Sequence, residues 1–138
     1  MAGEVVRFWA AGYIRKCVAI ATSGPFGSIR NPLYVGSFLI TLGYCVMANS
    51  IVVLAAAMLA FCVFHGAAIF YEERYLTRLF GNQFIDYCKS VPRLFPRWPR
   101  GGGEEQYSFR CALENREHIS AIFAGIVALA FALKIALK

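Results

Sequence analysis

Residues 31–71 read NPLYVGSFLITLGYCVMANSIVVLAAAMLAFCVFHGAAIFY and contain no Asp, Glu, Lys or Arg. A helix needs about 20 apolar residues to cross the hydrocarbon core of a bilayer, which is roughly 30 Å thick. The stretch therefore has the length of two crossings, and the polar pair Asn49-Ser50 near its middle predicts the turn between them. We expect one span at 33–48, a second at 51–71, and antiparallel packing of the two as a tight transmembrane helical hairpin.

Small residues on both predicted spans favour close contact between them. Gly36, Ser37 and Gly43 lie on the first span, and residues 55–57 of the second are all Ala. Helices in lipid associate through close packing of small residues, because the hydrophobic effect does not drive them together. The hairpin is therefore expected to hold together through these positions.

The composition of the whole chain also points to lipid. Of its 138 residues, 59% are apolar and 16% are charged, whereas a soluble domain has about half apolar and a quarter charged residues. The net charge is +6, but the basic residues flank apolar runs, so we expect no nucleic acid partner. The five cysteines are scattered without a CxxC pair, and the two histidines are far apart. This spacing predicts no metal site.

The rest of the chain divides around the hairpin. We expect an all-α integral membrane protein with a single membrane domain. Amphipathic interface helices flank the hairpin, the first at 4–21 and the second at 72–88, with a break possible at Gly81. The expected segments are an interfacial helix with a polar loop at 1–31, a helix with a Pro-rich tail at 72–99, a linker at 100–118, and a C-terminal transmembrane helix at 119–137.

The basic residues are unevenly divided between the two sides of the predicted hairpin. Residues 72–118 carry eight Arg and Lys, whereas the Asn49-Ser50 turn carries none. Loops rich in Arg and Lys remain on the cytoplasmic side. A multi-pass topology follows, with 1–31 and 72–118 in the cytoplasm.

A hairpin of two full spans brings its ends together. Arg30, Asn31 and Tyr34 should therefore lie near Glu72 and Glu73, about 40 residues away in sequence. Two adjacent carboxylates beside hydrocarbon are costly. They either anchor the helix at the interface through nearby arginines, or bind the cationic group of a ligand whose carboxylate an arginine holds. Glu73 is favoured over Glu72 as the one that faces the hairpin groove.

Two motifs at the ends of the hairpin resemble those of a known family. Gly24 to Gly36 reads GPFGSIRNPLYVG, similar to the pattern GPY-x-x-x-RHP-x-Y-x-G. Glu72-Glu73, then Phe80-Gly81, Tyr87 and Val91-Pro92-Arg93, is similar to EE, FG, Y and VPR in that order. In their order around a hairpin, over roughly residues 3–96, the motifs resemble the isoprenylcysteine carboxyl methyltransferase and phospholipid methyltransferase family.

The resemblance implies methyl transfer from S-adenosylmethionine to a lipophilic acceptor, such as a prenylated cysteine carboxylate or a phospholipid amine, at the cytoplasmic membrane face. It also implies a cofactor site. Asn31 and Tyr34 would line this site and Arg30 would shape it, Glu72 and Glu73 would hold the ammonium or the ribose hydroxyls, and the backbone of Val91, Pro92, Arg93 and Leu94 would approach the adenine. No residue is assigned to catalysis.

The sequence departs from the family pattern at several points. Asn31 stands where the family has His, and Phe26 where it has Tyr. Relatives usually carry further helices before the region of Arg7, and this chain adds the apolar stretch 119–137. These departures leave open a reduced or inactive member, or one that gains helices from a partner or a second copy. The alternative functions are a non-catalytic membrane scaffold and a membrane lipid or sterol reductase that uses NADPH.

Overall fold

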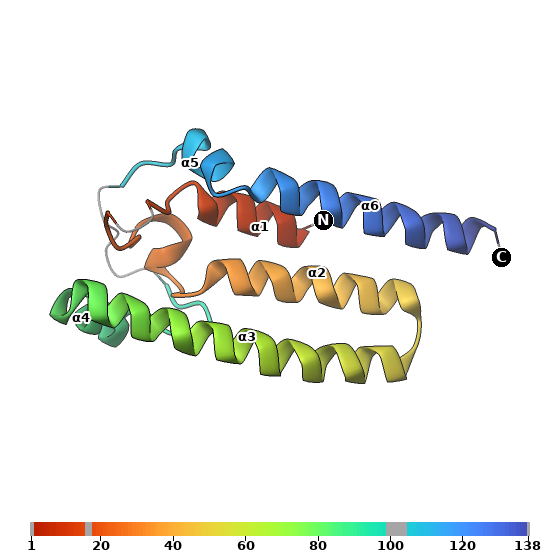
Figure 1. The fold of residues 1–138 in the computed structure, drawn as a ribbon, viewed down its shortest axis with the longest axis horizontal. Helices are drawn as coiled ribbons and strands as arrows, with labels where there is room; N and C mark the ends of the chain where they lie inside the picture. Colours follow the sequence, from red (N-terminus) through yellow and green to blue (C-terminus); the bar gives the residue numbers. More distant parts are fainter. Residues whose placement is uncertain (1, 16–17, 99–104, 138) are drawn as a thin grey trace.

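The computed structural model of the chain describes residues 2–15, 18–98 and 105–137, and this part consists of helices joined by loops, without a strand (Figure 1). The helices labelled α1, α2, α3 and α6 lie roughly alongside one another, and α4 and α5 lie toward one end. In chain order, the helices are α1 (Ala2–Ala11), the 3-10 helix η1 (Gly24–Gly27), α2 (Pro32–Ala48), α3 (Ile51–Phe80), α4 (Asn82–Ser90), α5 (Phe109–Glu114) and α6 (Glu117–Ala136).

The expected hairpin is formed by α2 and α3, with its turn at Asn49-Ser50. Asn49 adopts a left-handed conformation, with φ of 48°, and its N–H donates to the carbonyl of Val46. The Ser50 hydroxyl accepts a hydrogen bond from the N–H of Val53 and so caps the start of α3. Both residue types suit these positions, since Asn tolerates the left-handed region and Ser is a favoured N-cap.

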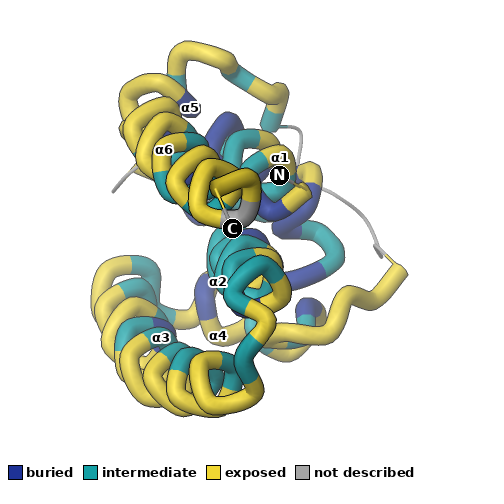
Figure 2. Tube along the Cα trace, turned by 90° about the vertical axis from the view of Figure 1, so that its right-hand side faces the viewer, coloured by how far each residue is buried: buried dark blue, intermediate teal, exposed yellow. Residues whose placement is uncertain are grey.

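Two of the described helices, α3 and α6, are long and apolar enough to cross a membrane. The first expected span, α2, is apolar but has only 17 residues, which corresponds to about 25 Å at 1.5 Å per residue. Much of the outer surface of α3 and α6 is exposed (Figure 2). Large apolar side chains such as Leu59 and Phe123 lie on it, as expected for helices that face lipid.

As expected, the helix continues beyond the second predicted span, which ends at residue 71. The helix α3 continues through Glu72 and Glu73 to Phe80, so the acidic pair lies within regular helix. The break occurs at Gly81, whose φ of 55° is easily reached by glycine and ends α3. After this break, α4 turns back, and its Phe84 is buried.

The first helix, α1, ends at Ala11, so the expected helix at 4–21 is wrong for the described residues 12–15 and 18–21, and residues 16–17 lie outside the described part. The reason is a set of contacts from the C-terminal part of the chain. The Asn115 side chain donates to the carbonyls of Ala11 and Ile14, at 3.0 and 3.1 Å. The N–H of Ser108 donates to the carbonyl of Gly12 at 3.0 Å. These bonds satisfy carbonyls that a longer helix would have used internally.

The stretch 100–118 is not the simple linker that we expected. Residues 109–114 form α5, capped by the Ser108 hydroxyl, which accepts from the N–H of Cys111. The glycines of this expected linker, at 101–103, lie outside the described residues. The following helix, α6, packs against α1 and α2, where the Tyr44 hydroxyl donates to the carbonyl of Ala124 at 2.7 Å.

Candidate functional site

The acidic pair on α3 meets the residues that precede and begin α2, as the hairpin geometry predicts. Glu73 forms an ion pair with Arg30 at 3.3 Å and a second with Arg93 at 2.6 Å. The side chains of Glu73 and Arg30 are each only 15% exposed. Proximity of Arg30 to Glu73 is therefore confirmed, and the carboxylate is held by two guanidinium groups in a half-buried position.

Glu72 is held more loosely than its neighbour. The Tyr34 hydroxyl donates to Oε2 of Glu72 at 3.0 Å, so this predicted contact between the hairpin ends is also confirmed. The ring of Tyr34 meets His65 edge-on, and His65 stacks on Phe61 with ring centroids 3.9 Å apart. The rings of His65 and Phe61, both on α3, thus position Tyr34, and Tyr34 in turn positions Glu72.

The segment that follows α4 packs beside the start of α2. The N–H of Arg30 donates to the carbonyl of Pro92 at 2.9 Å, and the Asn31 amide donates to the carbonyl of Arg93 at 3.2 Å. The side chain of Val91 is buried, whereas Leu94 is 44% exposed. The predicted site residues from the two motifs are thus brought together, except that Leu94 turns outward.

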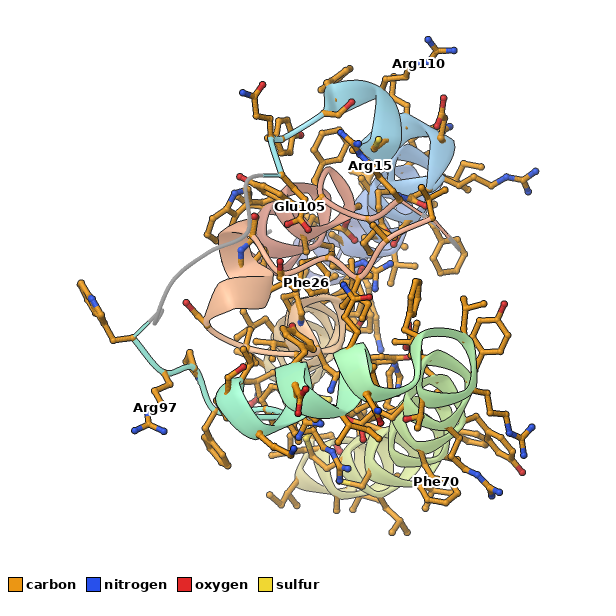
Figure 3. The ribbon with its side chains drawn as sticks, turned by 90° about the vertical axis from the view of Figure 1, so that its left-hand side faces the viewer. Arg15, Phe26, Phe70, Arg97, Glu105 and Arg110 are labelled. Carbon is orange, nitrogen blue, oxygen red and sulfur yellow. The ribbon has the colours of Figure 1, made fainter. Side chains whose placement is uncertain are left out.

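A cavity of about 410 Å³ lies at this end of the molecule. Figure 3 looks onto this end, with Phe26 between the α3–α4 region and the α5–α6 segment. Tyr34 and residues 91–94 do not line the cavity, so they support the residues that do. Its lining is mostly apolar or aromatic with a few charged groups, and includes Ile14, Ile20, Phe26, Arg30, Asn31, Glu72, Glu73, Leu76, Phe80, Phe84, Tyr87, Asn115 and Glu117.

Tyr87 forms part of the cavity wall and is partly buried there. Its hydroxyl donates to the carbonyl of Phe26 at 2.8 Å and so ties α4 to η1. Burial raises the pKa of Tyr87 above its ordinary value, because the phenolate would be poorly solvated there. Tyr87 is therefore a neutral hydrogen-bond donor at all physiological pH values. On the rim, the hydrogen bond and charge of Glu73 raise the pKa of Arg93.

The sequence did not identify the cavity residues of the C-terminal segment. Asn115 and Glu117 line the same cavity as Glu72 and Glu73. Glu117 is 6% exposed and forms an ion pair with Arg7 of α1 at 2.9 Å. The motif resemblance ends before this segment. The one available signal was a polar stretch next to an apolar run, which here precedes the run, whereas Glu72 and Glu73 follow theirs.

A second link joins the C-terminal segment to the loop beside the cavity. The Glu105 carboxylate accepts hydrogen bonds from the N–H groups of Ser23 and Thr22, at 2.8 and 3.2 Å. Ser23 itself is 4% exposed. The loop before η1 is therefore held in place by residues more than 80 positions later in the chain.

The arrangement suits a small polar ligand that carries both a positive and a negative group. Glu72 offers a carboxylate for a cationic group, and Arg30 offers a guanidinium for an anionic one. Neither of the two histidines, His65 and His118, lines the cavity. Among the residues that the structure describes, no group of three or more His, Cys, Asp or Glu is placed to hold a metal ion. These groups suit ligand positioning more than proton transfer.

Comparisons of the sequence with known proteins place the chain in a family. Residues 4–83 match the sequence model of a family described as phospholipid methyltransferase. The chain is 39% identical over 125 residues to the cobalt-zinc-cadmium resistance protein CzcN of Cupriavidus metallidurans, covering 88% of this chain and 57% of that protein. It is 31% identical over 98 residues to the protein-S-isoprenylcysteine O-methyltransferase of Schizosaccharomyces pombe, covering 71% and 42%.

A third relative is the nickel-cobalt-cadmium resistance protein NccN of Alcaligenes xylosoxydans xylosoxydans. It is 38% identical over 105 residues, which are 75% of this chain and 49% of that protein. The chain thus spans about half the length of the curated relatives it matches. No solved structure matches it significantly.

Proposed function

Because the chain belongs to the phospholipid methyltransferase family, we propose that it transfers a methyl group from S-adenosylmethionine to a lipophilic acceptor at the cytoplasmic face of a membrane. The observation that carries the proposal is the cavity in which Glu72, Glu73 and Arg30 converge. It is built largely from residues inside the region that matches the family, 4–83.

The residues of the cavity fit this cofactor in size and charge. Ligand cavities have volumes of about 300–1,000 Å³, and this one measures about 410 Å³. Nε of Arg30 is buried and has no hydrogen-bond partner among the described residues. Such a donor is costly unless a ligand satisfies it. Arg30 would hold the carboxylate of the cofactor, and Glu72 its ammonium group.

S-adenosylmethionine supplies a methyl group that its sulfonium charge has already activated. The chain therefore needs mainly to align the acceptor with the methyl group and to exclude water. The apolar and aromatic lining, which includes Phe26, Phe80 and Phe84, provides the dry wall. A carboxylate acceptor would need no general base, which is consistent with a cavity without histidine.

The position of the cavity supports a lipophilic acceptor. It lies where α3 passes from its uncharged part, residues 51–71, into its charged part at Glu72. An amphipathic molecule could place its polar end in the cavity while its chains remain in lipid. The excess of Arg and Lys in 72–118 supports a cytoplasmic location for the end of the molecule that holds the cavity.

Titration of the purified chain with S-adenosylmethionine and with NADPH, side by side, tests the proposal. We expect binding of S-adenosylmethionine and none of NADPH. Binding of NADPH alone would replace the proposal by a membrane reductase. Binding of neither would support a non-catalytic scaffold that retains the fold.

A further inference from the structure

The stretch that follows α4, residues 94–98, carries large apolar side chains that are exposed. It reads LFPRW. Phe95 and Trp98 are 84% and 89% exposed, and Leu94 is 44% exposed. The apolar side chains exposed on α3 and α6 face lipid, but this stretch belongs to no helix and to no predicted span. A patch of large exposed apolar side chains marks a surface that meets a partner or a membrane.

Hydrogen bonds hold the backbone of this stretch against the residues that precede α2. Before it, the N–H of Arg30 donates to the carbonyl of Pro92 at 2.9 Å. Within it, the N–H of Arg97 donates to the carbonyl of Ser28 at 3.0 Å. The ring of Pro96 restricts the backbone between these two points. The exposed side chains are therefore presented by a backbone that is fixed on the main body of the protein.

These attachments place the stretch at the edge of the apolar part of the hairpin. Residues 31–71 carry no charged side chain, and Arg30 immediately precedes this run. At the other end of the run, the Arg93 side chain binds Glu73 at 2.6 Å. An uncharged run of this kind occupies the hydrocarbon core of the bilayer. Residues 94–98 therefore lie at the level where the core ends and the lipid headgroups begin.

At this level, the stretch extends sideways from the helices. Figure 3 looks along the helices from the end that holds the cavity, and Arg97 lies to one side of them. Figure 2, seen from the opposite end, shows an exposed part of the chain that leaves the bundle sideways in the same manner. A segment that continued past the tip of the molecule would enter water. One that extends sideways at headgroup level enters the lipid leaflet.

The charge around the stretch is complementary to an anionic lipid surface. Residues 87–103 contain four Arg and Lys and no Asp or Glu. The Arg97 guanidinium forms no ion pair with a residue that the structure describes. Basic side chains beside a membrane are attracted to its anionic headgroups. Aromatic rings are favoured at the same level, because they are amphipathic.

We propose that residues 94–98 form a membrane-interface anchor that inserts into the lipid leaflet on the side of the cavity. Phe95 and Trp98 lie at the boundary between headgroups and acyl chains, and Arg97 binds lipid phosphate. Because the adjoining backbone accepts from Arg30, which lines the cavity, the anchor also holds the cavity at headgroup level. The inference requires a chain embedded in a membrane and does not depend on methyl transfer.

The fluorescence of Trp98 tests the inference, because the chain has only two tryptophans, Trp9 and Trp98. Trp9→Phe leaves Trp98 as the sole reporter in the full chain, which is reconstituted in phosphatidylcholine vesicles. The lipids are unmodified, brominated near the headgroup, or brominated near the chain end, since bromine quenches tryptophan at close range. In the matched control, Trp9→Phe and Trp98→Phe are combined with Asp86→Trp on α4, where the side chain of Asp86 is 72% exposed.

We expect Trp98 to be quenched strongly by lipid brominated near the headgroup and weakly by lipid brominated near the chain end. Acrylamide in the water should quench it several-fold less than the control. Phe95→Ser should shift its emission to longer wavelength, because the shared contact with lipid is weakened. Phosphatidylglycerol in the vesicles should increase the quenching by shallow bromine, and Arg97→Gln should abolish that increase.

Two results would overturn the anchor. Acrylamide quenching of Trp98 equal to that of the control would place the stretch in water. Protection from both acrylamide and bromine would mean that protein covers it, either a partner or a second copy. An increase with phosphatidylglycerol that persists in Arg97→Gln would refute the phosphate contact. If Trp9→Phe fails to fold, the difference between wild type and Trp98→Phe supplies the same signal.

Discussion

Arg93 binds the carboxylate of Glu73 through two nitrogen atoms, Nε at 3.1 Å and Nη2 at 2.6 Å. Arg30 approaches the same carboxylate from the other motif, at 3.3 Å. Both oxygens of Glu73 are therefore already engaged. Glu72 differs, because Tyr34 occupies its Oε2 and no described residue donates to its Oε1. The carboxylate that is available to a ligand is that of Glu72, although the sequence favoured Glu73.

The two carboxylates should therefore respond differently to the same substitution. Glu72→Gln should weaken S-adenosylmethionine binding roughly ten- to hundred-fold, because a charge-assisted hydrogen bond is lost, with little change in stability. Glu73→Gln should lower the thermal stability, because it leaves half-buried Arg30 without its partner. Calorimetric titration and thermal unfolding of both variants measure the difference. If both bind as tightly as the wild type, the cofactor does not lie here.

Gly36 forms a different contact from the one that its sequence suggested. A Cβ at Gly36 would meet the carbonyl oxygen of Gly3 and the side chain of Arg7, both on α1. A Cβ at Gly43 would meet nothing within 4 Å. The small residues of α2 were expected to face the second span. One of them instead allows α1 to approach, and the other contacts no neighbour.

Gly36→Ala should destabilise the protein by about 1–3 kcal/mol, because backbone atoms of α1 cannot move aside easily. Gly43→Ala is the matched control on the same helix. It should be neutral or stabilise by up to about 1 kcal/mol, since alanine favours helix over glycine. Thermal unfolding in detergent compares the two. Equal effects at both positions would mean that α1 is not packed closely on α2.

The sequence was sufficient to predict the hairpin and the meeting of its two ends. That prediction needed only the length of the uncharged run and the polar pair at Asn49-Ser50. It correctly placed Arg30 near Glu73 and Tyr34 near Glu72, because two spans of similar length return to the same side. The break at Gly81 also follows from a local property of the residue.

The C-terminal segment that lines the cavity, with Asn115 and Glu117, could not be predicted in the same way. Its position depends on single contacts over long sequence separations, such as Arg7 with Glu117 and Ser23 with Glu105. Neither pair lies in a periodic pattern, and a charged residue before an apolar run has many possible partners. The early end of α1 has the same origin, because the Asn115 side chain donates a hydrogen bond to the carbonyl of Ala11, the last residue of that helix.

Because the Tyr87 hydroxyl must stay protonated in the folded protein, we expect the folded state to lose stability at alkaline pH. In the unfolded chain the phenol of Tyr87 ionises near the ordinary pKa of about 10, whereas burial raises the pKa in the folded chain. The contribution to stability is therefore complete below about pH 10 and is lost as the pH rises above it. Tyr87→Phe should lower the stability by about 1 kcal/mol at neutral pH and flatten the alkaline decline.

Thermal unfolding of the wild type and Tyr87→Phe from about pH 8 to about pH 11 measures this difference. Tyr71→Phe is the control, because Tyr71 is 72% exposed and its substitution should leave the decline unchanged. An alkaline decline that is identical in wild type and Tyr87→Phe would contradict the raised pKa of Tyr87.

The orientation of the chain in the membrane should follow from how its Arg and Lys residues are distributed between the two ends of the hairpin. The turn at Asn49-Ser50 carries no Arg or Lys, whereas the opposite end of the hairpin carries eight in 72–118. We therefore expect Ser50 to lie outside the cytoplasm and Gln106 inside it. In a background in which the five native cysteines are replaced, Ser50→Cys and Gln106→Cys are each labelled in intact cells with a membrane-impermeant thiol reagent. Labelling is expected at position 50 only, with both positions labelled after permeabilisation. Labelling at 106 alone before permeabilisation would reverse the orientation and place the cavity on the outer face, where intracellular S-adenosylmethionine could not reach it.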